Sequence, residues 1–146
     1  MNPFLSFLLL PAVLLTACND DDDNAFRLAC GPDIQIVDVI VEREFDDFHL
    51  DSARVTDLCL EVTISASGCG SQGWTLDLIT FGEVAESYPT QTSARLLFDD
   101  GVADGDFTCA AYITETYTFD LSPYLTPGTL PTVLSLTGTE TTLSIE

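Results

Sequence analysis

Leu58-Cys59-Leu60-Glu61-Val62-Thr63-Ile64-Ser65-Ala66 is a segment in which apolar and polar side chains alternate. Because successive side chains of a β-strand point to opposite faces, the apolar members would share one face of a strand. A glycine-rich turn at residues 67–73 leads into a second alternating segment, residues 74–81. There Trp74, Leu76 and Leu78 would face inward. The pattern predicts two half-buried strands joined by a turn.

The same alternation, with many β-branched residues, recurs along the rest of the chain. It predicts further strands at residues 33–41, 94–98, 109–120, 132–136 and 141–145. No segment keeps a helical 3.6-residue period for long, and there is no internal repeat. About seven short strands separated by turn signals predict an all-β domain over residues 30–146, namely an antiparallel, immunoglobulin-like β-sandwich.

The composition limits the classes of partner. The 146 residues are 46% hydrophobic, which is enough for a core. The net charge is −20, from 24 acidic residues against four arginines and no lysine. This balance excludes nucleic-acid or anionic-lipid binding through a basic patch.

The beginning of the chain has the pattern of an export signal. An apolar run from Phe4 ends in Leu15-Thr16-Ala17-Cys18, and four aspartates follow at residues 20–23. The run is shorter than the roughly 20 residues of a membrane span and suits a signal peptide. The sequence resembles the lipobox of bacterial lipoproteins, which implies a signal peptide at residues 1–17 and a lipid on Cys18. No basic residue precedes Arg27, although the start of a signal peptide typically carries one. The alternative is an ordinary secretory signal in which Cys18 is incidental.

The acidic run adds a second resemblance, because Bacteroidetes lipoproteins at the cell surface often carry acidic residues just after the lipidated cysteine. The resemblance implies an exported protein held in the outer membrane by lipid on Cys18, with residues 18–29 as a flexible tether and the domain outside the cell. A periplasm-facing domain is the alternative. Residues 67–74, 86–91 and 119–123 resemble small uncharacterised lipoproteins of the same group, which bears on fold and location only.

Four cysteines remain in the mature domain: Cys30, Cys59, Cys69 and Cys109. In an exported domain they predict two disulfides, with free buried thiols as the alternative. If the strands at 33–41 and 58–66 form an antiparallel pair, Cys30 would lie near Cys69. The remaining pair would be Cys59–Cys109, linking strands of facing sheets. No C-x₂-C spacing suggests zinc.

Two stretches of the sequence carry residues suited to metal or acid–base chemistry. The loop Asp99-Asp100-Gly101-Val102-Ala103-Asp104-Gly105-Asp106 is rich enough in carboxylates for Ca²⁺. However, Val102 stands where an EF-hand would need an acid, so we expect a plain loop with no metal and no cofactor. His49, the only histidine, lies between acids and lacks a G-x-S-x-G partner motif, so no catalytic residue is predicted.

The aromatic residues offer one more hypothesis. Trp74 and the four tyrosines could form a sugar-stacking face, although Trp74 is better explained as core beside a disulfide; the tyrosines are Tyr88, Tyr112, Tyr117 and Tyr124. We therefore expect a non-enzymatic binding or structural module at the cell surface, whose protein or glycan partner the sequence does not name. The alternatives are a periplasm-facing envelope-assembly or glycan-binding accessory domain, with or without Ca²⁺, and a small hydrolase that uses His49.

Overall fold

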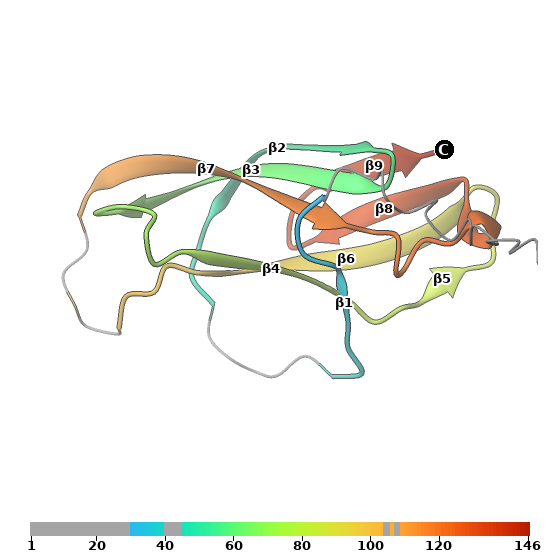
Figure 1. Ribbon diagram of the computed structural model, residues 1–146, viewed down its shortest axis with the longest axis horizontal. Helices are drawn as coiled ribbons and strands as arrows, with labels where there is room; N and C mark the ends of the chain where they lie inside the picture. Colours follow the sequence, from blue (N-terminus) through green and yellow to red (C-terminus); the bar gives the residue numbers. More distant parts are fainter. Residues whose placement is uncertain (1–29, 40–44, 104–105, 107–108) are drawn as a thin grey trace, which may run out of the picture.

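The computed structural model describes residues 30–39, 45–103, 106 and 109–146. Within these residues the chain forms nine β-strands and one short 3-10 helix, arranged as two facing sheets (Figure 1). One sheet has the order β2-β3-β7, and the other has the order β1-β4-β6-β8-β9 with β5 also paired to β6. The elements are β1 (Gln35–Ile36), β2 (His49–Thr56), β3 (Cys59–Gly68), β4 (Thr75–Thr80), β5 (Val84–Ala85), β6 (Thr90–Asp99), β7 (Ala111–Asp120), η1 (Pro127–Thr129), β8 (Thr132–Thr137) and β9 (Thr141–Ile145).

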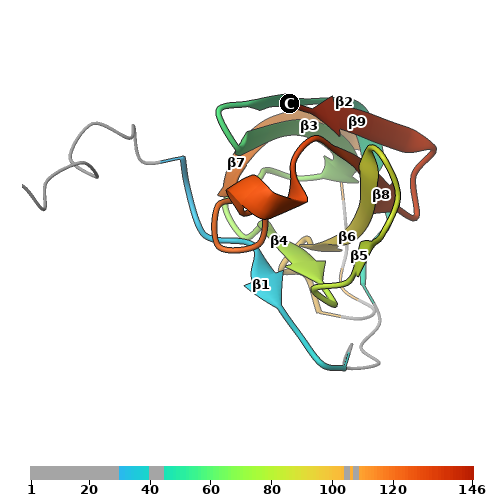
Figure 2. The same cartoon turned by 90° about the vertical axis from the view of Figure 1, so that its right-hand side faces the viewer.

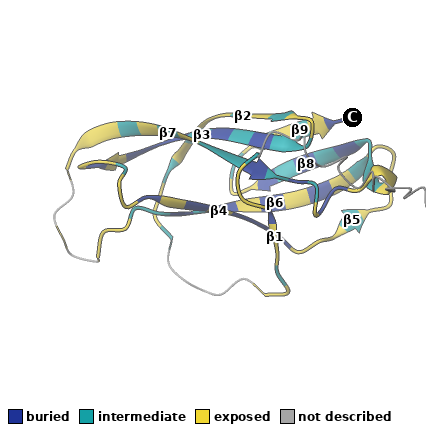
Figure 3. Cartoon of the chain, in the orientation of Figure 1, coloured by how far each residue is buried: buried dark blue, intermediate teal, exposed yellow. Residues whose placement is uncertain are grey.

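The core lies between the two sheets. Along β3, Leu60, Val62 and Ile64 have no exposed surface, and the side chains between them lie on the outer face. From the other sheet, Leu78 and Phe98 are 1% exposed. Buried residues recur along the strands of both sheets (Figure 3). The alternation predicted for residues 58–66 and 74–81 is therefore confirmed, as are an all-β fold and two sheets.

The sequence predicted an antiparallel sandwich, but the sheets also contain parallel pairs. β1 pairs with β4 in parallel, and so does β6 with β8. The chain crosses to the other sheet as β7 between β6 and β8, so β8 can return in the same direction as β6. By chain order, β4 and β8 would correspond to the neighbouring C and F strands of an immunoglobulin domain. Here β6 separates them, so the immunoglobulin-like order is not confirmed.

The strand β2 was not predicted. It is an edge strand paired with β3, and its register shifts between Leu50 and Ser52, where Asp51 is the extra residue of a β-bulge. Leu50 faces the core side, and the next partly buried residues are Ala53 and Val55. The spacing of three residues across the bulge breaks the two-residue period on which the prediction relied.

The predicted pairing of the cysteines is wrong, although all four form disulfides. The bonds are Cys30–Cys59 and Cys69–Cys109. The prediction paired residues 33–41 with β3, whereas β2 takes that place and only β1 is a strand within 33–39; residues 40–41 lie outside the described residues.

The observed pairs follow from the register. The backbone N–H of Ile34 donates to the carbonyl of Asp120, whose register partner is Cys59, so Cys30 arrives at the start of β3. Cys69 follows β3 and Cys109 precedes β7. Because β3 and β7 are antiparallel neighbours, these two positions meet.

The two disulfides therefore mark opposite ends of the sandwich. β3 has ten residues, which span about 30 Å at roughly 3.4 Å per residue. We call the end with Cys30 and Cys59 the tether end, and the end formed by residues 45–48, 68–74 and 99–103 the loop end. Viewed along its length, the molecule has β9 beside β2, so the two sheets approach each other at that side (Figure 2).

Candidate functional site

Three segments that are distant in sequence meet at the loop end. The backbone N–H of Asp46 donates to the carbonyl of Phe98 at 3.0 Å, and the N–H of Asp100 donates to Oδ2 of Asp46 at 2.8 Å. Residues 45–48 therefore lie beside the end of β6. This part of β6 comes after Arg95, the last residue of β6 that pairs with β8. This contact brings Asp46, which precedes β2, to the acidic loop that begins at Asp99.

The result is a cluster of three carboxylates. Ligand atoms of Asp46, Asp99 and Asp100 all lie within 4.8 Å of one another. Asp99 accepts from the N–H of Gly101 and Asp100 from the N–H of Val102, each at 2.8 Å. Three carboxylates offer six oxygens, and three of these already accept backbone hydrogen bonds. Since Ca²⁺ takes about six to eight oxygens, a cation here would need further ligands.

The sequence had identified only part of this cluster. Asp99 and Asp100 belong to the acidic loop at residues 99–106, which was expected to be a plain loop without metal, and Asp104 lies outside the described residues. Asp106 is described, but it does not belong to the cluster. No sequence pattern pointed to Asp46, because it lies 54 residues before Asp100.

Glycine contacts set how closely the loops approach. A Cβ on Gly101 would lie 2.7 Å from the carbonyl oxygen of Gly73, and Gly101 has a φ of +73°. Both the contact and the conformation therefore require glycine at this position. The Cys69–Cys109 disulfide ties the turn at 68–74 to the start of β7. The loop end is thus held by a covalent bond and by backbone packing.

Aromatic rings fill the interior beneath the loop end. Trp74 meets Phe98 edge to face with ring centroids 5.0 Å apart, and Phe98 meets Phe48 at 5.9 Å. Trp74 is 8% exposed and belongs to the core cluster, as predicted. The sugar-stacking face is not formed by the five rings together. Tyr124 is buried and donates to the carbonyl of Glu83, whereas Tyr88 is 89% exposed.

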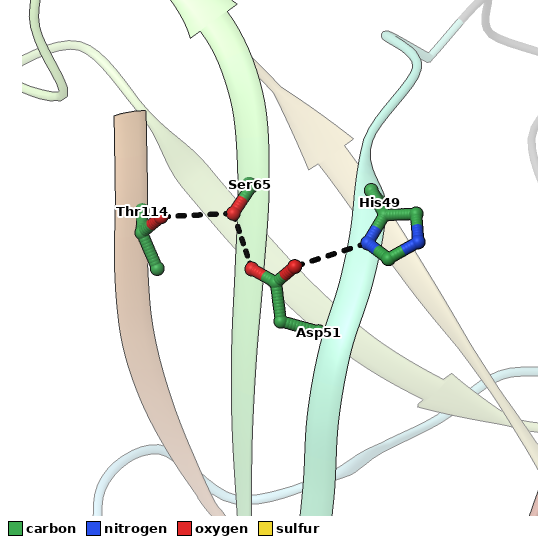
Figure 4. A network of polar contacts seen from close by, with 4 residues as sticks. All are labelled: His49, Asp51, Ser65 and Thr114. Atoms are coloured by element: carbon green, nitrogen blue, oxygen red, sulfur yellow. Dashed lines mark hydrogen bonds and ion pairs between the residues drawn. The ribbon is translucent and has the colours of Figure 1, made fainter. Parts of the chain in front are cut away.

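His49 belongs to a polar network on the outer face of the β2-β3-β7 sheet (Figure 4). The β-bulge directs Asp51 toward β3, where the buried hydroxyl of Ser65 donates to Oδ2 of Asp51. Oδ1 lies 3.0 Å from Nδ1 of His49, and Ser65 also contacts the Thr114 hydroxyl at 2.9 Å. The Ser65 hydrogen bond, aided by His49, lowers the pKa of Asp51 below its ordinary value.

The order of this network differs from that of a hydrolytic triad. In a triad, histidine lies between the serine and the aspartate and takes the serine proton. Here Asp51 lies between Ser65 and His49. Ser65 donates to a carboxylate of lowered pKa, which is a weak base. The network gives the buried Ser65 hydroxyl its hydrogen-bond partners, and the bulge places Asp51 among them. Neither feature requires a catalytic role.

Comparison with known proteins identifies no relative. No family model, no curated protein and no solved structure matches the chain. Within the described ranges, no helix is long and apolar enough to cross a membrane.

Proposed function

We propose that this chain is a lipid-anchored protein of the bacterial cell envelope that carries a non-enzymatic binding domain with its loop end directed away from the membrane. The observation that carries the proposal is the placement of Cys30 at the tether end, opposite the loop end on β3. Cys30 is the first described residue, twelve positions after Cys18. Cys18 itself lies outside the described residues. A chain attached through Cys18 would enter the sandwich at the end remote from the loops.

The attachment would also be mechanically firm. The Cys30–Cys59 disulfide joins the entering chain to β3, the central strand of its sheet. Hydrogen bonds continue the connection, since Asp120 donates to the carbonyl of Pro32 and accepts from Ile34, each at 2.9 Å. Tension on an anchor would therefore pass into the middle of a sheet and not peel an edge.

The charge supports display away from the bilayer. Membrane surfaces that contain anionic lipids carry a negative potential. A chain of net charge −20 would be repelled by such a surface. The tether would thus hold the domain near the membrane while electrostatics kept it off the headgroups. Display on the outer face of the outer membrane is the version that we propose, in keeping with the acidic run at residues 20–23.

We also propose a distant relation to the immunoglobulin arrangement. Its support is the β2-β3-β7 sheet, which has the order of strands A, B and E by position in the chain. Such sandwiches carry their binding loops at one end, and the loop end corresponds to that placement.

A calcium-dependent accessory domain facing the periplasm is the second candidate, and the carboxylate cluster favours it. If Ca²⁺ binds there, millimolar Ca²⁺ should raise the melting temperature, and Asp46→Asn should abolish the rise. Asp57→Asn, at the far end of β2, is the matched control; asparagine tolerates its φ of +50°. No rise in the unaltered chain would eliminate the calcium version.

Replacement of Cys18 tests the anchor. Cys18→Ala should move the protein from the membrane fraction to the soluble fraction and abolish labelling by a radioactive fatty acid. A broad-specificity protease added to intact cells then tests display. Loss of the unaltered protein, while periplasmic markers survive, is expected for the outer face. Unchanged membrane attachment of Cys18→Ala would contradict the proposal.

A further inference from the structure

A hollow of about 390 Å³ lies at the loop end, between residues 68–74 and 100–102. Four of the residues that line it are glycines, Gly68, Gly70, Gly73 and Gly101, so much of its wall is main chain. Its volume lies within the range of small-molecule sites, which is roughly 300–1,000 Å³. Backbone walls offer fixed carbonyl and N–H groups in place of mobile side chains.

The wall is fixed before any ligand arrives. The contact between Gly73 and Gly101 leaves no room for a side chain, and the Cys69–Cys109 disulfide covers one flank. Beneath the wall, Trp74 is packed edge to face against Phe98. A rigid site loses little conformational entropy on binding, which favours affinity.

The hollow contains a hydrogen-bond donor without a partner. Trp74 is 92% buried, and among the described residues no acceptor bonds its Nε1–H. The atom itself is not enclosed, because among the described residues the one buried side-chain polar atom without a partner is Oγ1 of Thr92; Nε1 therefore keeps access to solvent from the hollow. The ring edge with Nε1 faces Gly68: a Cβ there would lie 3.6 Å from Nε1 and 3.5 Å from the carbonyl oxygen of Gly70. A donor and an acceptor thus lie close together beside Gly68, and all three residues line the hollow.

The class of ligand follows from these groups. A hydroxyl can accept from an indole N–H and donate to a carbonyl at the same time. Anionic ligands are disfavoured by the carboxylate cluster and by the net charge of −20. A cation without a lone pair could not accept from Nε1. Val102, an exposed apolar residue on the wall, offers contact to C–H groups.

We propose that the hollow binds a neutral saccharide, one hydroxyl of which accepts a hydrogen bond from Nε1–H of Trp74 and donates one to the carbonyl oxygen of Gly70. This inference rests on the proposed function as a binding module and supplies its ligand class. The sugar lies at the end of the domain that would face away from the membrane. The acidic surroundings select against uronic acids and other charged sugars.

Trp74 is the only tryptophan in the chain, so its indole N–H gives a single signal in the NMR spectrum of isotope-labelled protein. The purified full chain carrying Cys18→Ala is titrated with maltohexaose, cellohexaose, mannohexaose and xylohexaose, and with oligogalacturonate as the charged counterpart. We expect at least one neutral oligosaccharide to shift the indole signal saturably at millimolar concentration. No shift with any neutral sugar, or a shift with oligogalacturonate alone, would overturn the inference.

Gly68→Ala provides the steric test. Its methyl group would make ordinary contacts of 3.4–3.6 Å with Trp74 and Gly70, so the fold is retained while Nε1 is covered. Sugar binding should weaken by about two- to tenfold, the loss of one well-placed hydrogen bond. Gly128→Ala, within η1 and with only a 3.9 Å contact, is the control and should bind normally.

A second variant guards against a failure of Gly68→Ala to fold. Trp74→Phe removes the donor and keeps an aromatic ring, and calorimetry measures its binding; unweakened binding in either variant would overturn the inference. A failure of the proposed lipid anchor can be told apart from a failure of sugar binding. Membrane fractionation reports on Cys18, whereas the indole signal reports on the hollow.

Discussion

Replacement of Gly101 by alanine should destabilise the domain through two separable effects. Gly101 has a φ of +73°, and an L-residue in this region costs about 1–2 kcal/mol. In addition, the new Cβ would lie 2.7 Å from the carbonyl oxygen of Gly73, so one of the two backbones must move. Overpacking of this kind costs about 1–3 kcal/mol. The expected loss of unfolding free energy is therefore about 2–5 kcal/mol.

Gly138→Ala separates the two effects. Gly138 has a φ of +88°, and a Cβ there would meet nothing within 4 Å. This variant should lose only the conformational part, about 1–2 kcal/mol. Both substitutions restrict the unfolded chain to the same extent, so that contribution cancels in the comparison. The difference between the variants measures the contact between the loops.

Urea denaturation provides the assay. The midpoint of Gly101→Ala should lie below that of Gly138→Ala, with similar m-values if the denatured states are equally open. Equal midpoints for the two variants would refute the close approach of residues 68–74 and 99–103. A midpoint of Gly101→Ala equal to that of the unaltered chain would refute the positive φ as well.

Three further variants test other parts of the structure. Replacement of both Cys69 and Cys109 by serine should cost about 4 kcal/mol, because the bridge closes a loop of 40 residues; an unchanged urea midpoint would contradict the bond. Asp51→Asn should destabilise the domain at about pH 7, and the difference from the unaltered chain should shrink as the pH falls below the ordinary value of 3.8. The reason is that a carboxylate with a lowered pKa stabilises the fold above that value and loses its contribution on protonation; a difference independent of pH in acid denaturation would argue against it. Leu78→Ala, at a site 1% exposed, should cost about 2–5 kcal/mol in the same urea assay, and a loss below about 1 kcal/mol would place Leu78 outside the core.

The sequence predicted those strands whose alternation is uninterrupted. In β3, and in β4 as far as Leu78, every second residue is apolar and buried, so period and burial agree there. In β2 the bulge at Asp51 shifts the phase, and a polar outer face leaves few apolar residues to reveal the strand. Periodicity also carries no information on which strands become neighbours. The parallel pairing of β6 with β8 depends on β7 crossing to the other sheet, and no local pattern encodes that crossing.

The predicted cysteine pairing was wrong for the same reason. Its logic required residues 33–41 to lie beside β3, and the unpredicted β2 occupies that position. The loop end was only partly accessible to sequence reasoning. Asp99 and Asp100 stood out as a local run, and Trp74 was correctly predicted as core. Asp46 joins the cluster from a distant segment, and the open donor of Trp74 depends on the absence of a side chain at Gly68.

Mass spectrometry of the intact protein extracted from cell envelopes tests the lipid anchor, on which the account depends, most directly. The expected result is a mass that corresponds to a chain beginning at Cys18, with both disulfides intact and acyl groups attached to that residue. A chain that still contains residues 1–17, or one that begins at another residue without acyl groups, would contradict the lipid anchor. The placement of the loop end away from the membrane would then lose its basis.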